Sequence, residues 1–184
     1  MGAGEQASPN VTRVNIGCER SIHLALRGKR MEQPVTRVLF VCLGNICRSP
    51  IAEGVMCHLL EGSQLSQGYA VASAGTSSWH NGEPPHPGSI AIAHAHQIDL
   101  SGQVSAAVTG ADKDLFDWFV AMDSQNRADL IEMGIPQEKV LLLLDYAGEG
   151  SPTNVPDPYY EGGFDRVFGL ILQGCEGLLE HLES

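Results

Sequence analysis

From Thr36 onward the chain alternates short apolar runs with amphipathic segments, and this order restricts the possible folds more than any other feature. The run 38–42, VLFVC, is β-branched and apolar, as expected of a strand buried on both faces. After a short polar loop, Pro50 suits the first position of a helix and Ser49 suits its N-cap. A strand followed at once by a helix predicts a parallel βαβ unit.

The same pattern repeats to the end of the chain. Further strands are expected at 69–74, 116–122 and 140–144, and further helices at 89–97, 124–133 and 164–182. We therefore predict an α/β fold of three layers, α/β/α, around a four-stranded parallel sheet. Ligands of such folds bind outside the carboxyl ends of the strands.

Residues 1–34 lack this periodicity, so we place the start of a single domain, 35–184, at this boundary. Met31 lies just before it. We expect residues 1–34 to be a disordered tail or a mis-assigned extension upstream of the natural start.

Charge and cysteine content exclude several classes of protein. The formal charge is −11, and after residue 34 only six basic residues face 19 acidic ones, so a nucleic-acid partner is not expected. No apolar run reaches the roughly 20 residues that span a bilayer, and no signal peptide is recognisable. The five cysteines are too few for a disulfide scaffold. We expect a cytoplasmic, monomeric protein without membrane association.

The loop 42–48, CLGNICR, lies between the first strand and the first helix, where backbone N–H groups and the helix dipole bind a phosphate-sized anion. Gly44 and Asn45 tolerate the positive φ that a curled loop needs. Arg48 adds a planar fork matched to two oxygens of a tetrahedral anion. The same surroundings stabilise a thiolate, which makes Cys42 a candidate nucleophile.

The stretch VCLGNICRSPIAE (41–53), a Cys-x5-Arg loop after a strand, resembles the low-molecular-weight protein tyrosine phosphatases, across roughly residues 36–184. DPYYEGG at 157–163 resembles the acid loop of that family. The resemblance implies the flavodoxin-like phosphotyrosine phosphatase I fold, a phosphotyrosine-containing protein substrate, and no cofactor or metal. It also implies three catalytic groups: Cys42 as nucleophile, Arg48 as phosphate ligand and Asp157 as general acid and base.

Further roles rest on the same resemblance. The residues implied to contact substrate are Leu43, Gly44, Asn45, Ile46, Cys47, Ser49, Trp79, Tyr159 and Tyr160. Those implied to support the loop are Ser73, His96 and Asp123. Simpler roles stay open for several of these side chains: a core-edge position for Trp79, a solvent-facing His96, and an N-cap for Asp123.

Competing functions are distinguished by particular residues. The gap between Cys42 and Cys47 is too wide for a zinc knuckle, and a thioredoxin-coupled arsenate reductase needs a second cysteine pair that residues 58–174 lack. Protein arginine phosphatases of this type usually carry threonine where Ile46 stands. A catalytically silent phosphotyrosine-binding module would have lost a catalytic group, and none is missing. A reversible Cys42–Cys47 disulfide under oxidant is a further hypothesis.

Overall fold

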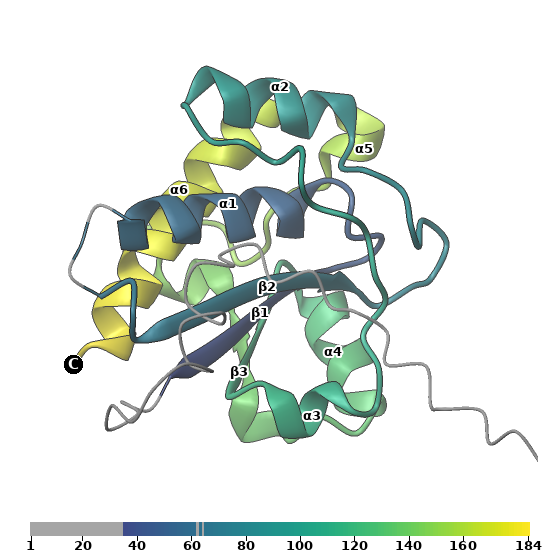
Figure 1. The fold of residues 1–184 in the computed structure, drawn as a ribbon, viewed down its shortest axis with the longest axis vertical. Helices are drawn as coiled ribbons and strands as arrows, with labels where there is room; N and C mark the ends of the chain where they lie inside the picture. Colours follow the sequence, from purple (N-terminus) through teal and green to yellow (C-terminus); the bar gives the residue numbers. More distant parts are fainter. Residues whose placement is uncertain (1–34, 62, 64) are drawn as a thin grey trace, which may run out of the picture.

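The computed structural model describes residues 35–61, 63 and 65–184 of the 184-residue chain. The expectations for residues 1–34 lie outside this part. The described chain forms a four-stranded parallel sheet in the order β2-β1-β3-β4, with helices on both faces (Figure 1). The predicted three-layer α/β/α architecture is therefore confirmed.

All four predicted strands are present, with small shifts at their ends. They are β1 (Thr36–Cys42), β2 (Tyr69–Gly75), β3 (Trp118–Ala121) and β4 (Val140–Leu142). Strand β3 starts two residues later than predicted because Phe116 turns into the core as the cap of a short helix. The predicted end of β4 is wrong, since the chain tightens there into a 3₁₀ turn, η2 (Leu143–Tyr146).

The four predicted helices are α1 (Arg48–Glu61), α2 (Pro87–Ala95), α4 (Ser124–Glu132) and α6 (Phe164–Leu182). Besides η2, three short elements were not predicted: α3 (Asp112–Leu115), η1 (Gln137–Lys139) and α5 (Pro158–Glu161). The predicted start of α1 is wrong. Its first helical residue is Arg48, so Ser49 is inside the first turn rather than at the N-cap, and its hydroxyl is free to face the loop.

Alternate residues of β1 face two separate cores, as the unbroken apolar run predicts. Val38 and Phe40 pack with α1 and α6 on one face, whereas Leu39 and Val41 pack on the α4 side. Figure 1 shows the same division, with α1, α2 and α6 above the sheet and α3 and α4 below it. No helix in the described part of the chain is long and apolar enough to cross a membrane.

The order of the strands fixes the place of a binding site. The chain passes from β1 to β2 on one side of β1 and then crosses to β3 on its other side. The carboxyl end of β1 is therefore a topological switch point, where the two connections diverge and leave a crevice outside the carboxyl edge of the sheet. Cys42 is the last residue of β1.

Candidate active site

The loop between β1 and α1 curls tightly around the end of β1. Asn45 adopts a left-handed conformation with φ of 53°, which asparagine tolerates better than most residues. Gly44 has no positive φ; a Cβ there would lie 2.9 Å from Cδ2 of His80, so a larger residue would require the His80 side chain to move. Gly75, at the end of β2, faces the loop even more closely, since its Cβ would lie 2.8 Å from the carbonyl oxygen of Leu43.

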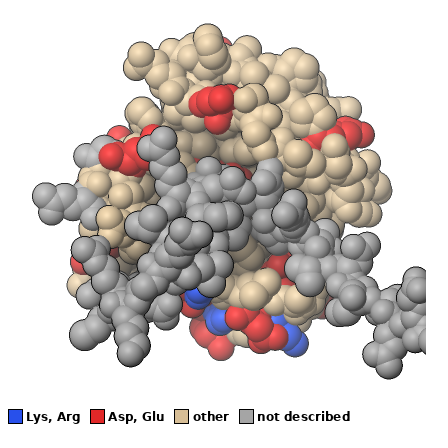
Figure 2. Space-filling view, viewed as in Figure 1, with Lys and Arg blue, Asp and Glu red and all other residues tan. Residues whose placement is uncertain are grey.

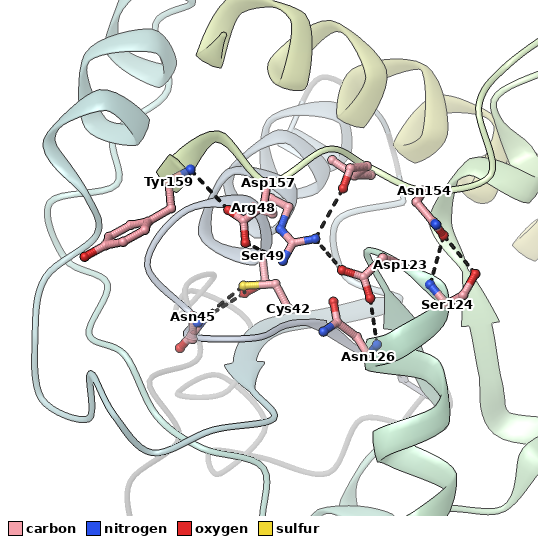
Figure 3. A network of polar contacts seen from close by, with 11 residues as sticks. Cys42, Asn45, Arg48, Ser49, Asp123, Ser124, Asn126, Asn154, Asp157 and Tyr159 are labelled. Carbon is pink, nitrogen blue, oxygen red and sulfur yellow. Dashed lines mark hydrogen bonds and ion pairs between the residues drawn. The ribbon is translucent and has the colours of Figure 1, made fainter. Parts of the chain in front are cut away.

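Cys42 is held at the floor of this loop and is 2% exposed. Its Sγ accepts a hydrogen bond from the backbone N–H of Asn45 at 3.3 Å and lies 3.1 Å from Oγ of Ser49 (Figure 3). Helix α1 starts six residues later at Arg48. Its dipole and the loop N–H groups favour negative charge at this position.

The side chain of Asn45 fixes the shape of the loop from beneath. Its amide nitrogen donates to the hydroxyls of Ser49 and Ser73, both at 2.9 Å, and its oxygen accepts from the backbone N–H of Ala106. Ser73 in turn donates to buried Glu53 at 2.6 Å. Asn45 and Ser49 thus lie behind the loop, so the expected substrate contact through their side chains is corrected: they shape the pocket without lining it.

Arg48 extends from the first turn of α1 into the pocket and is 3% exposed. Its Nη1 donates to Asp123 at 2.5 Å and to the carbonyl of Val155 at 3.2 Å, while Nη2 donates to Asp157 at 2.9 Å (Figure 3). Its Nε is buried and has no hydrogen-bond partner in the described structure. Burial disfavours the charged guanidinium, yet the negative groups around it, Cys42 first, raise the pKa of Arg48 above its ordinary value.

Asp123 combines the two roles that the sequence left open. It follows β3 and caps α4, because its Oδ1 accepts the N–H of Asn126 at 2.7 Å. Its Oδ2 holds Arg48. One carboxylate therefore ties the start of α4 to the guanidinium.

A small pocket of about 40 Å³ opens above the loop. Cys42 and Arg48 line its base, and Asp157 approaches from the N-cap of α5, where its Oδ1 accepts the N–H of Tyr159. Three aromatic side chains rim the opening: Trp79, 75% exposed, Tyr160, 78% exposed, and half-exposed Tyr159. The core-edge alternative for Trp79 is thus wrong, because a side chain this exposed covers no core.

Leu43, Gly44, Ile46 and Cys47 also line the pocket. Burial raises the pKa of Cys47 to about 12, and the nearby Cys42 and Asp157 add to the effect. The Cys47 side chain therefore stays a thiol near neutral pH.

The expected support from His96 is wrong. Its ring is exposed and stacks on Phe168 of α6, with ring centroids 4.0 Å apart, and no hydrogen bond joins it to Asn45 in the described structure. Its place as the C-cap of α2 directs it to the opposite end of that helix from the loop. Instead, Ser73 donates a hydrogen bond to Glu53, and Asn45 accepts one from the backbone N–H of Ala106.

Three residues at the site were missed by the sequence reasoning. Glu53 could have been noticed as an acidic residue four positions after Ser49, on the inward face of a helix. His80 lines the pocket and pairs with Glu83 at 2.8 Å, and His86 caps α2 through Nδ1. Their contacts with Glu83 and with the N-terminus of α2 are local, but the position of both histidines beside the first loop depends on how the loop 76–86 folds over it, which no local pattern predicts.

No group of three or more His, Cys, Asp or Glu side chains suited to a metal ion occurs within the described residues. The donors gathered at the pocket are instead N–H groups of the loop and one guanidinium. They suit an oxyanion.

Comparison with known proteins agrees with this geometry. Residues 37–184 match the family model described as "Low molecular weight phosphotyrosine protein phosphatase". YfkJ of Bacillus subtilis, named a low molecular weight protein-tyrosine-phosphatase, is 42% identical over 149 residues, which cover 80% of this chain and 96% of that protein.

Solved structures give the same result. The crystal structure of YfkJ superposes with a TM-score of 0.79 at 40% identity, covering 82% of this chain and 96% of that one. A Drosophila protein titled an arginine phosphatase superposes with a TM-score of 0.74 at 34% identity, covering 80% of this chain and 98% of that one.

Proposed function

The chain belongs to the low molecular weight phosphotyrosine protein phosphatase family, and on this premise we propose that it hydrolyses phosphotyrosine in proteins through a cysteinyl-phosphate intermediate. One observation carries the proposal. The buried Nε of Arg48 has no hydrogen-bond partner among the described residues, and it lies beside the thiol of Cys42 in a pocket rimmed by aromatic side chains. A phosphate oxygen satisfies that donor, and the aromatic rim suits a phenyl ester.

The first step uses the floor of the pocket. Cys42 Sγ attacks phosphorus in line with the ester oxygen, so that the S–P bond forms as the P–O bond breaks. Arg48 and the N–H groups of the loop stabilise the equatorial oxygens, which carry the negative charge. Because these donors are already held by Asn45 and Asp123, little reorganisation is needed.

Asp157 acts as general acid in the first step and as general base in the second. Its side chain lines the pocket and is 29% exposed, so it is available to a leaving phenolate oxygen there. It donates a proton to that oxygen in the first step. In the second step its carboxylate removes a proton from the attacking water, and phosphate leaves as the thiolate is regenerated.

Ser49 assists the second step. Its Oγ accepts from Asn45 and lies within hydrogen-bond distance of both Cys42 Sγ and the carbonyl of Ala74. The hydroxyl of Ser49 can therefore rotate, so that it donates its hydrogen bond to Cys42 Sγ instead of to the carbonyl of Ala74 as negative charge returns to the sulfur. This contact makes the thiolate a better leaving group.

Hydrolysis of p-nitrophenyl phosphate by the purified protein and three variants tests the mechanism. We expect Cys42→Ser and Arg48→Ala to be inactive, and Asp157→Ala to lose more activity on phenyl phosphate than on p-nitrophenyl phosphate, whose leaving group needs less protonation. The Cys42→Ser protein should retain phosphate or vanadate binding. Undiminished turnover by Cys42→Ser would exclude the covalent route.

A second candidate substrate is phosphoarginine, because a structural neighbour at 34% identity is titled an arginine phosphatase. Two features of this chain favour phosphotyrosine: apolar Ile46 in the loop and the aromatic rim formed by Trp79, Tyr159 and Tyr160. Matched peptides that carry either phosphotyrosine or phosphoarginine at one position distinguish the two. A higher kcat/KM for the phosphoarginine peptide would reverse the assignment.

The charge of the protein adds a constraint on the substrate. Asp and Glu are spread over the described surface on the face in Figure 2, whereas Lys and Arg are visible there only near the lower edge. Together with the net charge of −11, this disfavours acidic residues around the phosphotyrosine. A peptide panel in which Asp- or Glu-rich flanks raised kcat/KM would contradict this expectation.

The two loop cysteines support a proposal for redox regulation. Peroxide converts the Cys42 thiolate to a sulfenic acid, and the Cys47 thiol then displaces water to form a disulfide, which a thiol reductant reverses. Both cysteines line the same catalytic pocket, and both are free thiols in the structure. We expect Cys47→Ser to recover less activity than the parent after peroxide and thiol. Equal recovery would exclude a protective disulfide.

The same chemistry supports a cytoplasmic enzyme, since a reducing compartment keeps a nucleophilic thiol reduced. We also propose that the enzyme is a monomer. The described cysteines are all free. Fractionation of the native cells and sedimentation of the purified protein test the two statements. Recovery outside the cytoplasm, or a stable dimer at micromolar concentration, would contradict them.

A further inference from the structure

A second, larger concavity lies beside the catalytic pocket. It encloses about 750 Å³ between the loop that precedes α2, the first turns of α2, and the acid loop. Its walls are mainly apolar and are formed by Ile46, Pro84, Pro85, Pro87, Ile90 and Ala91. We call it the α2 groove. Figure 1 shows α2 close to α5, the two helices that contribute to its walls.

The α2 groove is continuous with the catalytic pocket. Ile46, His80 and Tyr159 line both. A peptide whose phosphotyrosine occupies the pocket leaves it over these shared side chains, and each further residue spans about 3.3 Å when extended. Residues within a few positions of the phosphotyrosine therefore reach the α2 groove.

The groove is rigidly joined to the phosphate loop. The backbone N–H of His86 donates to the carbonyl of Ile46 at 2.7 Å, and Ser89 Oγ donates to the carbonyl of Cys47 at 3.2 Å. Pro87, between these two contacts, and Pro84 and Pro85, just before them, restrict the backbone of the wall. A side chain bound in the groove thus has a fixed distance from the catalytic pocket, without an ordering cost in the protein.

The chemistry of the walls selects the occupant. Among the described residues, the acidic and basic side chains that line the groove are Glu83, whose Oε2 is paired with His80, and the histidines His80, His86 and His94, with no Lys or Arg. The described walls therefore carry no permanent positive charge that would favour an acidic side chain of the substrate. Ile90 and Ala91, together with the prolines, offer an apolar surface instead.

We propose that the α2 groove is a specificity subsite that binds an apolar side chain, such as leucine or isoleucine, located within about four residues of the phosphotyrosine in the substrate protein. This inference rests on the proposed phosphatase function and adds a substrate class to it. The catalytic pocket recognises the phosphorylated ring, and the α2 groove recognises the sequence around it.

A peptide panel tests the subsite. Each phosphotyrosyl nonapeptide carries alanine at all flanking positions except one, which is leucine, glutamate or lysine in turn. We expect leucine at one position to raise kcat/KM about tenfold over alanine, which corresponds to 1.4 kcal/mol. Glutamate at that position should give no gain.

Two variants locate the effect. Ile90→Glu and Ala91→Glu place a carboxylate in the groove wall, and the second lies on an exposed position, so it is easily accommodated. The readout is the ratio of kcat/KM for the leucine peptide to that for the alanine peptide within each variant, so any change in the chemical step cancels. We expect the ratio to fall from about ten to about one. The matched control, Ile131→Glu on α4, should keep the parent ratio.

The outcomes separate the subsite from the function. If phosphotyrosyl peptides are hydrolysed but leucine gives no gain at any position, or if Ile90→Glu and Ala91→Glu keep the parent ratio, the subsite is wrong and the phosphatase function stands. If no phosphotyrosyl peptide is hydrolysed, the proposed phosphatase function is wrong, and the subsite that rests on it is wrong as well. A concentration-dependent dimer that these two variants abolish would assign the groove to a second copy of this chain and overturn the proposal.

Discussion

Asp123 offers the sharpest test of how the site is held together, because its two carboxylate oxygens have separate tasks. Oδ1 caps α4 through the N–H of Asn126, and Oδ2 holds Nη1 of Arg48 at 2.5 Å. Asp123→Ala removes both contacts. Asp123→Ser keeps an oxygen for the cap but is too short to reach Arg48.

The two contacts differ in size. Loss of an N-cap costs about 1 kcal/mol of the free energy of unfolding. Removing one partner of a fully buried ion pair costs about 3–5 kcal/mol. Here Arg48 keeps Val155 and Asp157 as acceptors, and the side chain of Asp123 is 19% exposed, so we expect about 2 kcal/mol. The predicted losses are therefore about 3 kcal/mol for Asp123→Ala and about 2 kcal/mol for Asp123→Ser.

Activity should follow a different order from stability. Both variants release Nη1 of Arg48, so both should lose about 10–100-fold in kcat/KM on p-nitrophenyl phosphate, since a misplacement of about 1 Å can cost 100-fold. Urea unfolding and steady-state kinetics measure the two effects. If Asp123→Ser keeps parental activity, Asp123 does not position Arg48. If the two variants are equally stable, the cap contributes nothing measurable.

Three further predictions address the loop and its supports. Ser49→Ala should slow hydrolysis of the intermediate more than its formation, because the hydroxyl 3.1 Å from Cys42 Sγ is lost, so stopped-flow absorbance should show a stoichiometric burst of p-nitrophenol. Gly75→Ala should lower the free energy of unfolding by about 1–3 kcal/mol, measured in urea, because the added Cβ meets the backbone oxygen of Leu43. Burial raises the pKa of Cys47 from 9.0 to about 12, so the stability that its protonated thiol contributes is complete below pH 9 and declines as the pH rises toward 12. When the pH rises from 8 to 10, the free energy of unfolding measured in urea should therefore fall by about 1.4 kcal/mol less for Cys47→Ser than for the parent. An equal fall in the two proteins would contradict the raised pKa.

The sequence predicted the parts of the structure that local patterns encode. The buried run 38–42 and the Cys-x5-Arg spacing were enough to place Cys42 at the end of β1 and Arg48 above it. The same patterns located the four strands, because runs buried on both faces of a parallel sheet are unusually apolar.

The errors concern a helix start and a contact between separate segments. Ser49 was expected to cap α1, but the helix starts at Arg48, two residues before the predicted first position at Pro50, and the hydroxyl of Ser49 lies against Cys42 and Asn45 of the same loop. His96 was expected beneath the loop, but stacking on Phe168 of α6 holds it elsewhere. The partner of His96 is not recognisable from spacing alone, because it depends on how α2 and α6 pack.

The unliganded contacts of Arg48 indicate how binding and proton transfer are linked. Nη1 is committed to Asp123 and Val155, whereas the opposite edge has Nη2 on Asp157 and Nε without a partner in the described structure. A phosphate that takes both donors of this edge displaces the carboxylate of Asp157 from Arg48. That carboxylate is then released to turn toward the ester oxygen of the bound phosphate. We infer that substrate binding in this way frees Asp157 to act on the leaving group, and that release of phosphate returns it to Arg48.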